Sequence, residues 1–110
     1  MAVTEQALQL LKARYFLKDE KGTPVEDEPA LWLRLSKAIA AAEPTKKREQ
    51  CQQEFYDVLS TTMFLPNSPT IMNAGKRGGQ LAGCFVVPVE DDITAIFNAV
   101  KFAALIQSSL

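Results

Sequence analysis

Residues 64–75 read Phe-Leu-Pro-Asn-Ser-Pro-Thr-Ile-Met-Asn-Ala-Gly, and Cys84 follows in the apolar run Gly-Cys-Phe-Val-Val-Pro-Val. This stretch divides the chain, because its prolines and the glycines that follow rule out one continuous helix. Helical periodicity precedes it, and a short apolar run comes after it. A loop with several hydroxyl groups that leads through a glycine-rich bend to one thiol suits an anion pocket beside a cysteine.

Three helices are predicted upstream of this loop. The first begins after Thr4, a typical N-cap residue, and the second begins near Pro29, whose missing N–H costs nothing in a first turn. Pro44 is expected to end the second helix, and the third covers roughly residues 46–62. Residues 18–29 are rich in charge, glycine and proline, which predicts a turn or a short hairpin between the first two helices.

Downstream of the loop, the sequence predicts one strand and one helix. Residues 80–89 form a short apolar run rich in Val and Phe, which is typical of a buried strand. Asp91 or Asp92 is a suitable N-cap for a helix that begins at Ile93. A lone strand cannot satisfy its own backbone N–H and C=O groups, so we expect its partners to lie elsewhere. The fold class is therefore mainly α with a short β portion.

Composition excludes several classes of protein. The chain has 110 residues, enough for one small core, and a formal net charge of −1. Nucleic-acid binding needs an excess of Lys and Arg, which is absent, and no apolar run approaches the ~20 residues that span a bilayer. The two cysteines lack a disulfide-type spacing, which fits the reducing cytoplasm. With no histidine, the chain offers no imidazole base or histidine metal ligand.

The ordered set of motifs resembles the catalytic, large subunit of ribonucleotide reductases, in particular the adenosylcobalamin-dependent class. The resemblance rests on the loop of residues 64–75 and the Cys84 run, extends upstream to Arg14-Tyr15-Phe16-Leu17-Lys18-Asp19, and reaches Asp91 downstream. It implies an amino-terminal fragment, an expectation that agrees with a sequence ending on a helical pattern. Residues 1–63 would form a helical domain, and residues 64–110 the start of a ten-stranded α/β barrel.

The resemblance also implies roles for individual residues. Cys84 would supply a reducing equivalent to the substrate ribose and pair with a cysteine beyond residue 110. Ser68 would bind the nucleotide diphosphate. Ala82 and Gly83 stand where many relatives have serines, so only main-chain contacts with the substrate remain there. Asp91 would bind the sugar hydroxyl of the deoxynucleotide effector that sets specificity.

Each of these residues also has a structural interpretation. A free cysteine such as Cys84 behaves as a small hydrophobe and often lies in a core. Ser68 and Thr70 alternate with prolines, so their hydroxyls suit a rigid turn, and Asp91 suits an N-cap. Cys51 shares a helical face with apolar residues, which favours core packing, and we do not expect it to pair with Cys84.

The implied activity is the conversion of ribonucleotides to 2′-deoxyribonucleotides for DNA replication by thiyl-radical chemistry. The parent enzyme would use adenosylcobalamin, bound outside this chain, and a thioredoxin-type reductant. It would form a homodimer through the helix of residues 93–106, whereas the fragment alone would be inactive. Two alternatives stay open: the large subunit of the iron-dependent class, and a non-catalytic helical interaction module. A stand-alone thiol redox protein is disfavoured because no Cys-x-x-Cys occurs. Whether the substrate is a diphosphate or a triphosphate is left open.

Overall fold

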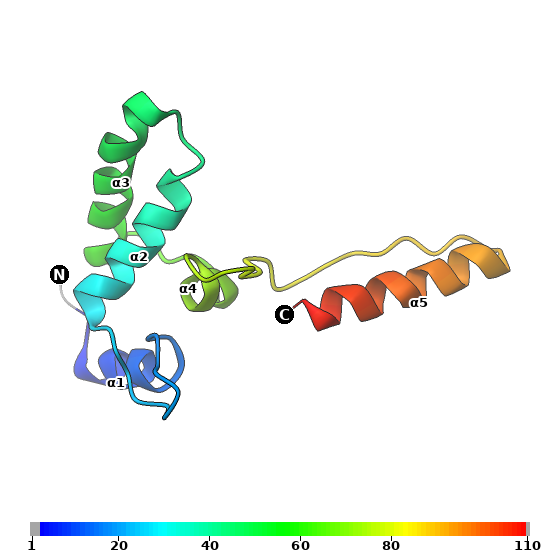
Figure 1. Ribbon diagram of the computed structural model, residues 1–110, viewed down its shortest axis with the longest axis horizontal. Helices are drawn as coiled ribbons and strands as arrows, with labels where there is room; N and C mark the ends of the chain where they lie inside the picture. The colour runs from blue at the N-terminus through cyan, green and yellow to red at the C-terminus, as the bar shows by residue number, and fades with distance from the viewer. Residues whose placement is uncertain (1–2, 110) are drawn as a thin grey trace.

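Five helices form the regular structure of residues 3–109, the part of the chain that this computed structural model describes (Figure 1). They are α1 (Glu5–Arg14), α2 (Glu28–Ala40), α3 (Thr45–Ser60), α4 (Ser68–Asn73) and α5 (Ile93–Ser108). The first four gather in one helical body, whereas α5 stands apart from them at the end of a long extended segment (Figure 1).

The predicted starts of the first two helices are confirmed. The Thr4 hydroxyl accepts a hydrogen bond from the Ala7 N–H at 3.2 Å, and the Asp27 carboxylate accepts one from the Ala30 N–H at 3.0 Å. Pro29 lies in the first turn of α2, as expected for a residue that lacks an N–H. Helix α3 also forms, shifted by one residue at its start and two at its end from the predicted range of 46–62.

The segment between α1 and α2 turns back on itself as a minimal hairpin. Lys18 and Pro24 form an isolated antiparallel bridge, and the Asp19 carboxylate accepts hydrogen bonds from the N–H groups of Lys21 and Thr23, both at 2.9 Å. Gly22 has φ of +81°, a left-handed conformation that glycine adopts without steric cost. This turn directs Glu26 back towards α2.

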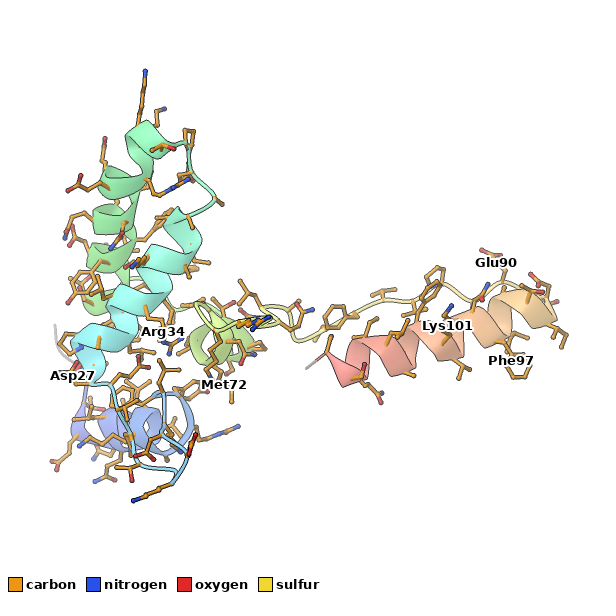
Figure 2. The ribbon with its side chains drawn as sticks, viewed as in Figure 1. Asp27, Arg34, Met72, Glu90, Phe97 and Lys101 are labelled. Carbon is orange, nitrogen blue, oxygen red and sulfur yellow. The ribbon has the colours of Figure 1, made fainter. Side chains whose placement is uncertain are left out.

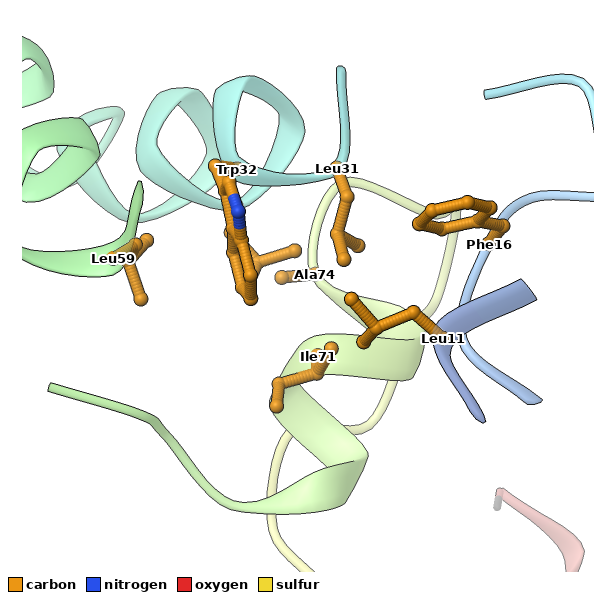
Figure 3. Close-up of a cluster of buried hydrophobic side chains, with 8 residues drawn as sticks. Leu11, Phe16, Leu31, Trp32, Leu59, Ile71 and Ala74 are labelled. Carbon is orange, nitrogen blue, oxygen red and sulfur yellow. The ribbon is translucent and has the colours of Figure 1, made fainter. Parts of the chain in front are cut away.

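The hydrophobic core lies where α1, α2, α3 and α4 meet (Figure 3). Trp32 lies at the centre of this core and is 1% exposed. Its indole N–H donates a hydrogen bond to the Glu28 carboxylate at 3.2 Å. The buried cluster comprises Leu11, Phe16, Leu31, Trp32, Leu35, Leu59, Ile71 and Ala74. Because Ile71 and Ala74 come from α4 and its C-cap, the proline-containing loop is part of this core and is held by it.

Arg34 of α2 connects three segments through one buried guanidinium group (Figure 2). It forms a bidentate ion pair with Glu26, with nitrogen–oxygen distances of 2.8 and 3.1 Å. The same group donates to the backbone carbonyls of Ile71 at 3.2 Å and Ala74 at 2.6 Å, and to that of Tyr15 at 3.4 Å. The carbonyls at the end of α4, which have no partner within that helix, are thereby satisfied.

Helix α4 was not predicted as a separate helix. Pro69 lies in its first turn, where proline is tolerated. Gly75, with φ of +85°, follows the C-cap residue Ala74, so the helix is confined to six residues. The prolines and glycines do prevent a long helix, as expected, but they leave room for this short one.

Residues 80–89 form no strand within the described range of 3–109. They lie extended, but no neighbouring strand pairs with their backbone, and the side chains of Val86 and Val89 are 98% and 61% exposed. A strand exists only through hydrogen bonds to a partner, so the predicted buried strand is not found here. The mainly helical class is confirmed, while the β portion is not seen.

Helix α5 buries none of its residues, although its composition is strongly apolar. Phe97 points away from the extended segment and is 66% exposed (Figure 2). The radius of gyration is 17.5 Å, compared with about 13 Å for a compact domain of similar length. This difference reflects the separate position of α5. Among the described helices, none combines the length and apolar character that crossing a membrane requires.

Candidate functional site

The loop at the start of α4 holds the segment that leads to Cys84. The side-chain amide of Asn67 donates to the Leu81 carbonyl at 2.9 Å, and the Thr70 hydroxyl lies 3.2 Å from the same oxygen. The Thr70 hydroxyl is also 2.5 Å from the Asn67 amide oxygen. These two polar side chains are therefore engaged with the backbone three residues before Cys84, which fixes that backbone against α4.

The bend between α4 and residue 81 depends on a very close approach of two backbone segments. The Asn73 side-chain amide donates to the Gln80 carbonyl at 2.9 Å, and the Gln80 side chain accepts from the Ala82 N–H at 3.1 Å. A Cβ added to Gly79 would lie 2.3 Å from the Asn73 carbonyl oxygen. Only glycine fits at this position, so the glycine-rich bend has a steric cause.

Two of the predicted substrate residues lie beside the loop. A Cβ added to Gly83 would lie 3.1 Å from Cγ of Pro69, which means that the Gly83 backbone packs on the residue next to Ser68. Ala82 is half-buried. The fold therefore brings Ser68, Ala82 and Gly83 into one neighbourhood, although they are separated by up to fifteen positions in the sequence.

Cys84 follows this contact directly and is exposed, whereas Cys51 on α3 is half-buried. Both are free thiols in the described structure. The core-packing interpretation of Cys84 does not describe this structure. Cys84 is exposed, and the backbone three residues before it, at Leu81, is hydrogen-bonded to the loop of residues 67–70.

Ser68 makes a contact that the sequence did not indicate. Its hydroxyl lies 2.9 Å from the phenol oxygen of Tyr15, which comes from the end of α1. Ser68 is exposed and Tyr15 half-buried. The only signal in the sequence was the Arg14–Asp19 motif, to which no role was assigned.

Asp91 and Asp92 take different positions at the start of α5. Asp92 is the N-cap residue, and its carboxylate accepts from the Ala95 N–H at 3.0 Å. Asp91 is exposed and makes no side-chain hydrogen bond among the described residues. The preceding residue, Glu90, lies at the end of the extended segment that is remote from α4 (Figure 2), so Asp91 is not part of the loop site.

Comparison with known proteins shows the family to which the chain belongs. A family model described as the all-alpha domain of ribonucleotide reductase matches residues 1–79. The chain belongs to the ribonucleotide reductase family. The matched range contains helices α1 to α4 and the loop of residues 64–75.

Individual relatives extend the match beyond residue 79. A protein named vitamin B12-dependent ribonucleoside-diphosphate reductase from Mycobacterium tuberculosis is 43% identical, over 92% of the chain. One with the same name from Thermoplasma acidophilum is 30% identical, over 99% of it. The ribonucleoside-diphosphate reductase subunit alpha of Chlamydia pneumoniae is 34% identical, over 90%. The chain spans only 15%, 22% and 9% of these three proteins.

One of the hollows in the described part of the chain borders this loop through Thr70. An apolar cavity of about 310 Å³ lies between α2, α3 and the start of the loop, and neither Ser68 nor Cys84 lines it. No group of three His, Cys, Asp or Glu residues that would hold a metal occurs within residues 3–109.

Proposed function

We propose that this chain is the amino-terminal part of a reductase that converts ribonucleotides to 2′-deoxyribonucleotides. The observation that carries the proposal is the exposed thiol of Cys84, held beside the loop of residues 67–70 in a chain of the ribonucleotide reductase family. Because the chain is a small share of its relatives' length, the proposal concerns the longer protein. The isolated chain is expected to be inactive.

In this reaction Cys84 is one of two thiols that together provide two electrons and two protons. The 2′ C–O bond of the ribose breaks, a C–H bond replaces it, the hydroxyl leaves as water, and the two sulfurs join as a disulfide. A separate cysteine thiyl starts the cycle by taking the 3′ hydrogen and returns it at the end. The second redox cysteine and the thiyl cysteine are expected beyond residue 110.

Substrate binding is proposed for three residues around the loop. The Ser68 hydroxyl donates a hydrogen bond to a phosphate oxygen of the nucleotide, and the backbones of Ala82 and Gly83 contact the ribose. Support comes from the packing of Gly83 on Pro69, which keeps this backbone next to Ser68. Neither Ala82 nor Gly83 has a side chain that would block a sugar from approaching the Cys84 thiol.

The effector site and the dimer are proposed for the second half of the chain. Asp91 would bind the sugar hydroxyl of a deoxynucleotide, and its carboxylate is available because Asp92 serves as the N-cap of α5. The apolar side chains of α5 are exposed, including Phe97 at 66% and Val100 at 60%. A second copy of the helix of residues 93–106 would cover them in a homodimer.

The parent is proposed to depend on adenosylcobalamin, because two of its relatives are named vitamin B12-dependent. When bound, this cofactor supplies the radical that oxidises a cysteine to its thiyl form. The chain has no histidine to offer a cobalt ion, and we assign no cobalamin contact to it. A thioredoxin-type protein in the cytoplasm would reduce the disulfide after each turnover.

The proposed domain division is residues 1–63 for the helical domain and 64–110 for the start of the barrel. In the assembled barrel, residues 80–89 would pair with strands from outside this chain. The extended backbone of these residues and their exposed Val and Phe side chains support this pairing.

The test is turnover of the intact reductase that contains this chain, with ribonucleoside diphosphate or triphosphate, a dithiol reductant and added adenosylcobalamin. The proposal expects deoxyribonucleotide to form only when the cofactor is present. Formation that needs an iron-containing second protein, and not cobalamin, would instead assign the iron-dependent class. No deoxyribonucleotide under either condition would overturn the proposed activity.

A further inference from the structure

Tyr15 contacts the proposed substrate site from a part of the chain 53 residues away in sequence. Its phenol oxygen lies 2.9 Å from the Ser68 hydroxyl, and either oxygen is able to donate the proton. This contact is the only side-chain hydrogen bond of Ser68 among the described residues.

The backbone of Tyr15 is firmly fixed. Its N–H donates to the Leu11 carbonyl at 2.8 Å, and its own carbonyl accepts from Arg34 at 3.4 Å. The aromatic ring is partly buried against the hydrophobic core. The phenol therefore reaches the loop from a rigid base, whereas the hydroxyl of Ser68 is free to rotate about a single bond.

The contact contributes little to the fold, because it lies at the exposed surface, where water competes for both hydroxyl groups. The other two polar side chains of the loop, Asn67 and Thr70, are already engaged with the Leu81 carbonyl. Ser68 is therefore the hydroxyl of this loop that faces outwards, and Tyr15 is its partner.

When an anion binds to Ser68, the donor and the acceptor of the Tyr15–Ser68 hydrogen bond are no longer interchangeable. A phosphate oxygen only accepts hydrogen bonds, so Ser68 must donate its single proton to it. The Tyr15 phenol must then donate to the serine oxygen. We propose that Tyr15 is a positioning residue that orients the Ser68 hydroxyl towards the substrate phosphate. This inference rests on the proposed role of Ser68.

The test is steady-state kinetics of the intact reductase with the Tyr15→Phe substitution, which keeps the ring and removes the hydroxyl. KM for the nucleotide should rise roughly threefold to tenfold, the effect of one lost hydrogen bond. Because the phosphate is remote from the reacting carbons, kcat should change little. Ser68→Ala should raise KM at least as much. Tyr56→Phe, at the other tyrosine of the chain, serves as the matched control and should leave KM unchanged.

The double variant separates positioning from a structural effect. If Tyr15 acts through Ser68, adding Tyr15→Phe to Ser68→Ala should not raise KM further. A full additional rise in the double variant would overturn the inference, because Tyr15 would then act independently. An unchanged KM for Tyr15→Phe, with a raised KM for Ser68→Ala, would overturn this inference alone. An unchanged KM for Ser68→Ala would overturn the proposed substrate role of Ser68 together with it.

Discussion

The Nη1 atom of Arg34 donates a 2.6 Å hydrogen bond to the Ala74 carbonyl, across 40 positions of sequence. Through this contact α2 holds the end of α4, and α4 in turn holds the backbone before Cys84. The position of the candidate site thus depends on a buried cation that lies outside it. Glu26 balances the charge, with its side chain 6% exposed against 10% for Arg34.

Replacing Arg34 by Met should destabilise the chain strongly. The substitution leaves the Glu26 carboxylate buried without its cation and removes the donor from the Ala74 and Ile71 carbonyls. The free energy of unfolding should fall by about 3 kcal/mol, measured by urea denaturation of the 110-residue chain. Arg48→Met is the control, since Arg48 is exposed and donates only to the Glu43 carbonyl. A loss for Arg34→Met no larger than for the control would refute the role assigned to Arg34.

Gly79→Ala should disrupt the bend that leads to Cys84. The new Cβ would lie 2.3 Å from the Asn73 carbonyl oxygen, which cannot be relieved by a side-chain rotation. Gly22→Ala is the comparison, since a Cβ added at Gly22 would have no atom within 4 Å. Its only cost is the positive φ, about 1–2 kcal/mol. Thermal unfolding should show the larger loss for Gly79→Ala. Equal losses would contradict the steric role of Gly79, because the bend would then accept the Cβ at no greater cost than a positive φ imposes.

Replacing Asp91 and Asp92 by Ala, one at a time, should have different effects. Asp92→Ala removes the N-cap of α5 and should cost about 1 kcal/mol of helix stability. This loss would appear as faster hydrogen exchange of the amides of residues 94–96. Asp91→Ala should leave that exchange unchanged but abolish the response of the intact reductase to deoxynucleotide effectors. If Asp91→Ala retained the effector response, the effector site would have to lie elsewhere.

Local signals in the sequence were sufficient for most of the helical architecture. Thr4 and Pro29 mark helix starts through chemistry confined to one turn, so the first two helices could be predicted without tertiary information. Helix α4 was missed because Pro69 was interpreted as a helix breaker, although proline is tolerated in a first turn. The β portion expected at residues 80–89 depends on partner strands, and none lies among the described residues.

The candidate site was predicted less completely than the fold. The Gly83 contact with Pro69 agrees with the expected closeness of Cys84 and the loop, but the roles of these residues remain predictions. The contacts of Arg34 and Tyr15 could not be predicted, because they join segments far apart in sequence and leave no periodic pattern. The sequence offered two candidates for the cap of α5, and the structure selects Asp92.

The most direct test of the account is multiple-turnover activity of the intact reductase with Cys84→Ser and, separately, Cys51→Ser. As an exposed side chain, Cys84 should tolerate the change without loss of folding, which thermal unfolding would verify. We predict that Cys84→Ser lowers kcat by at least about a thousandfold, while Cys51→Ser stays close to the unchanged enzyme. Normal turnover by Cys84→Ser would contradict the account, because Cys84 would then not be a redox thiol of the reaction.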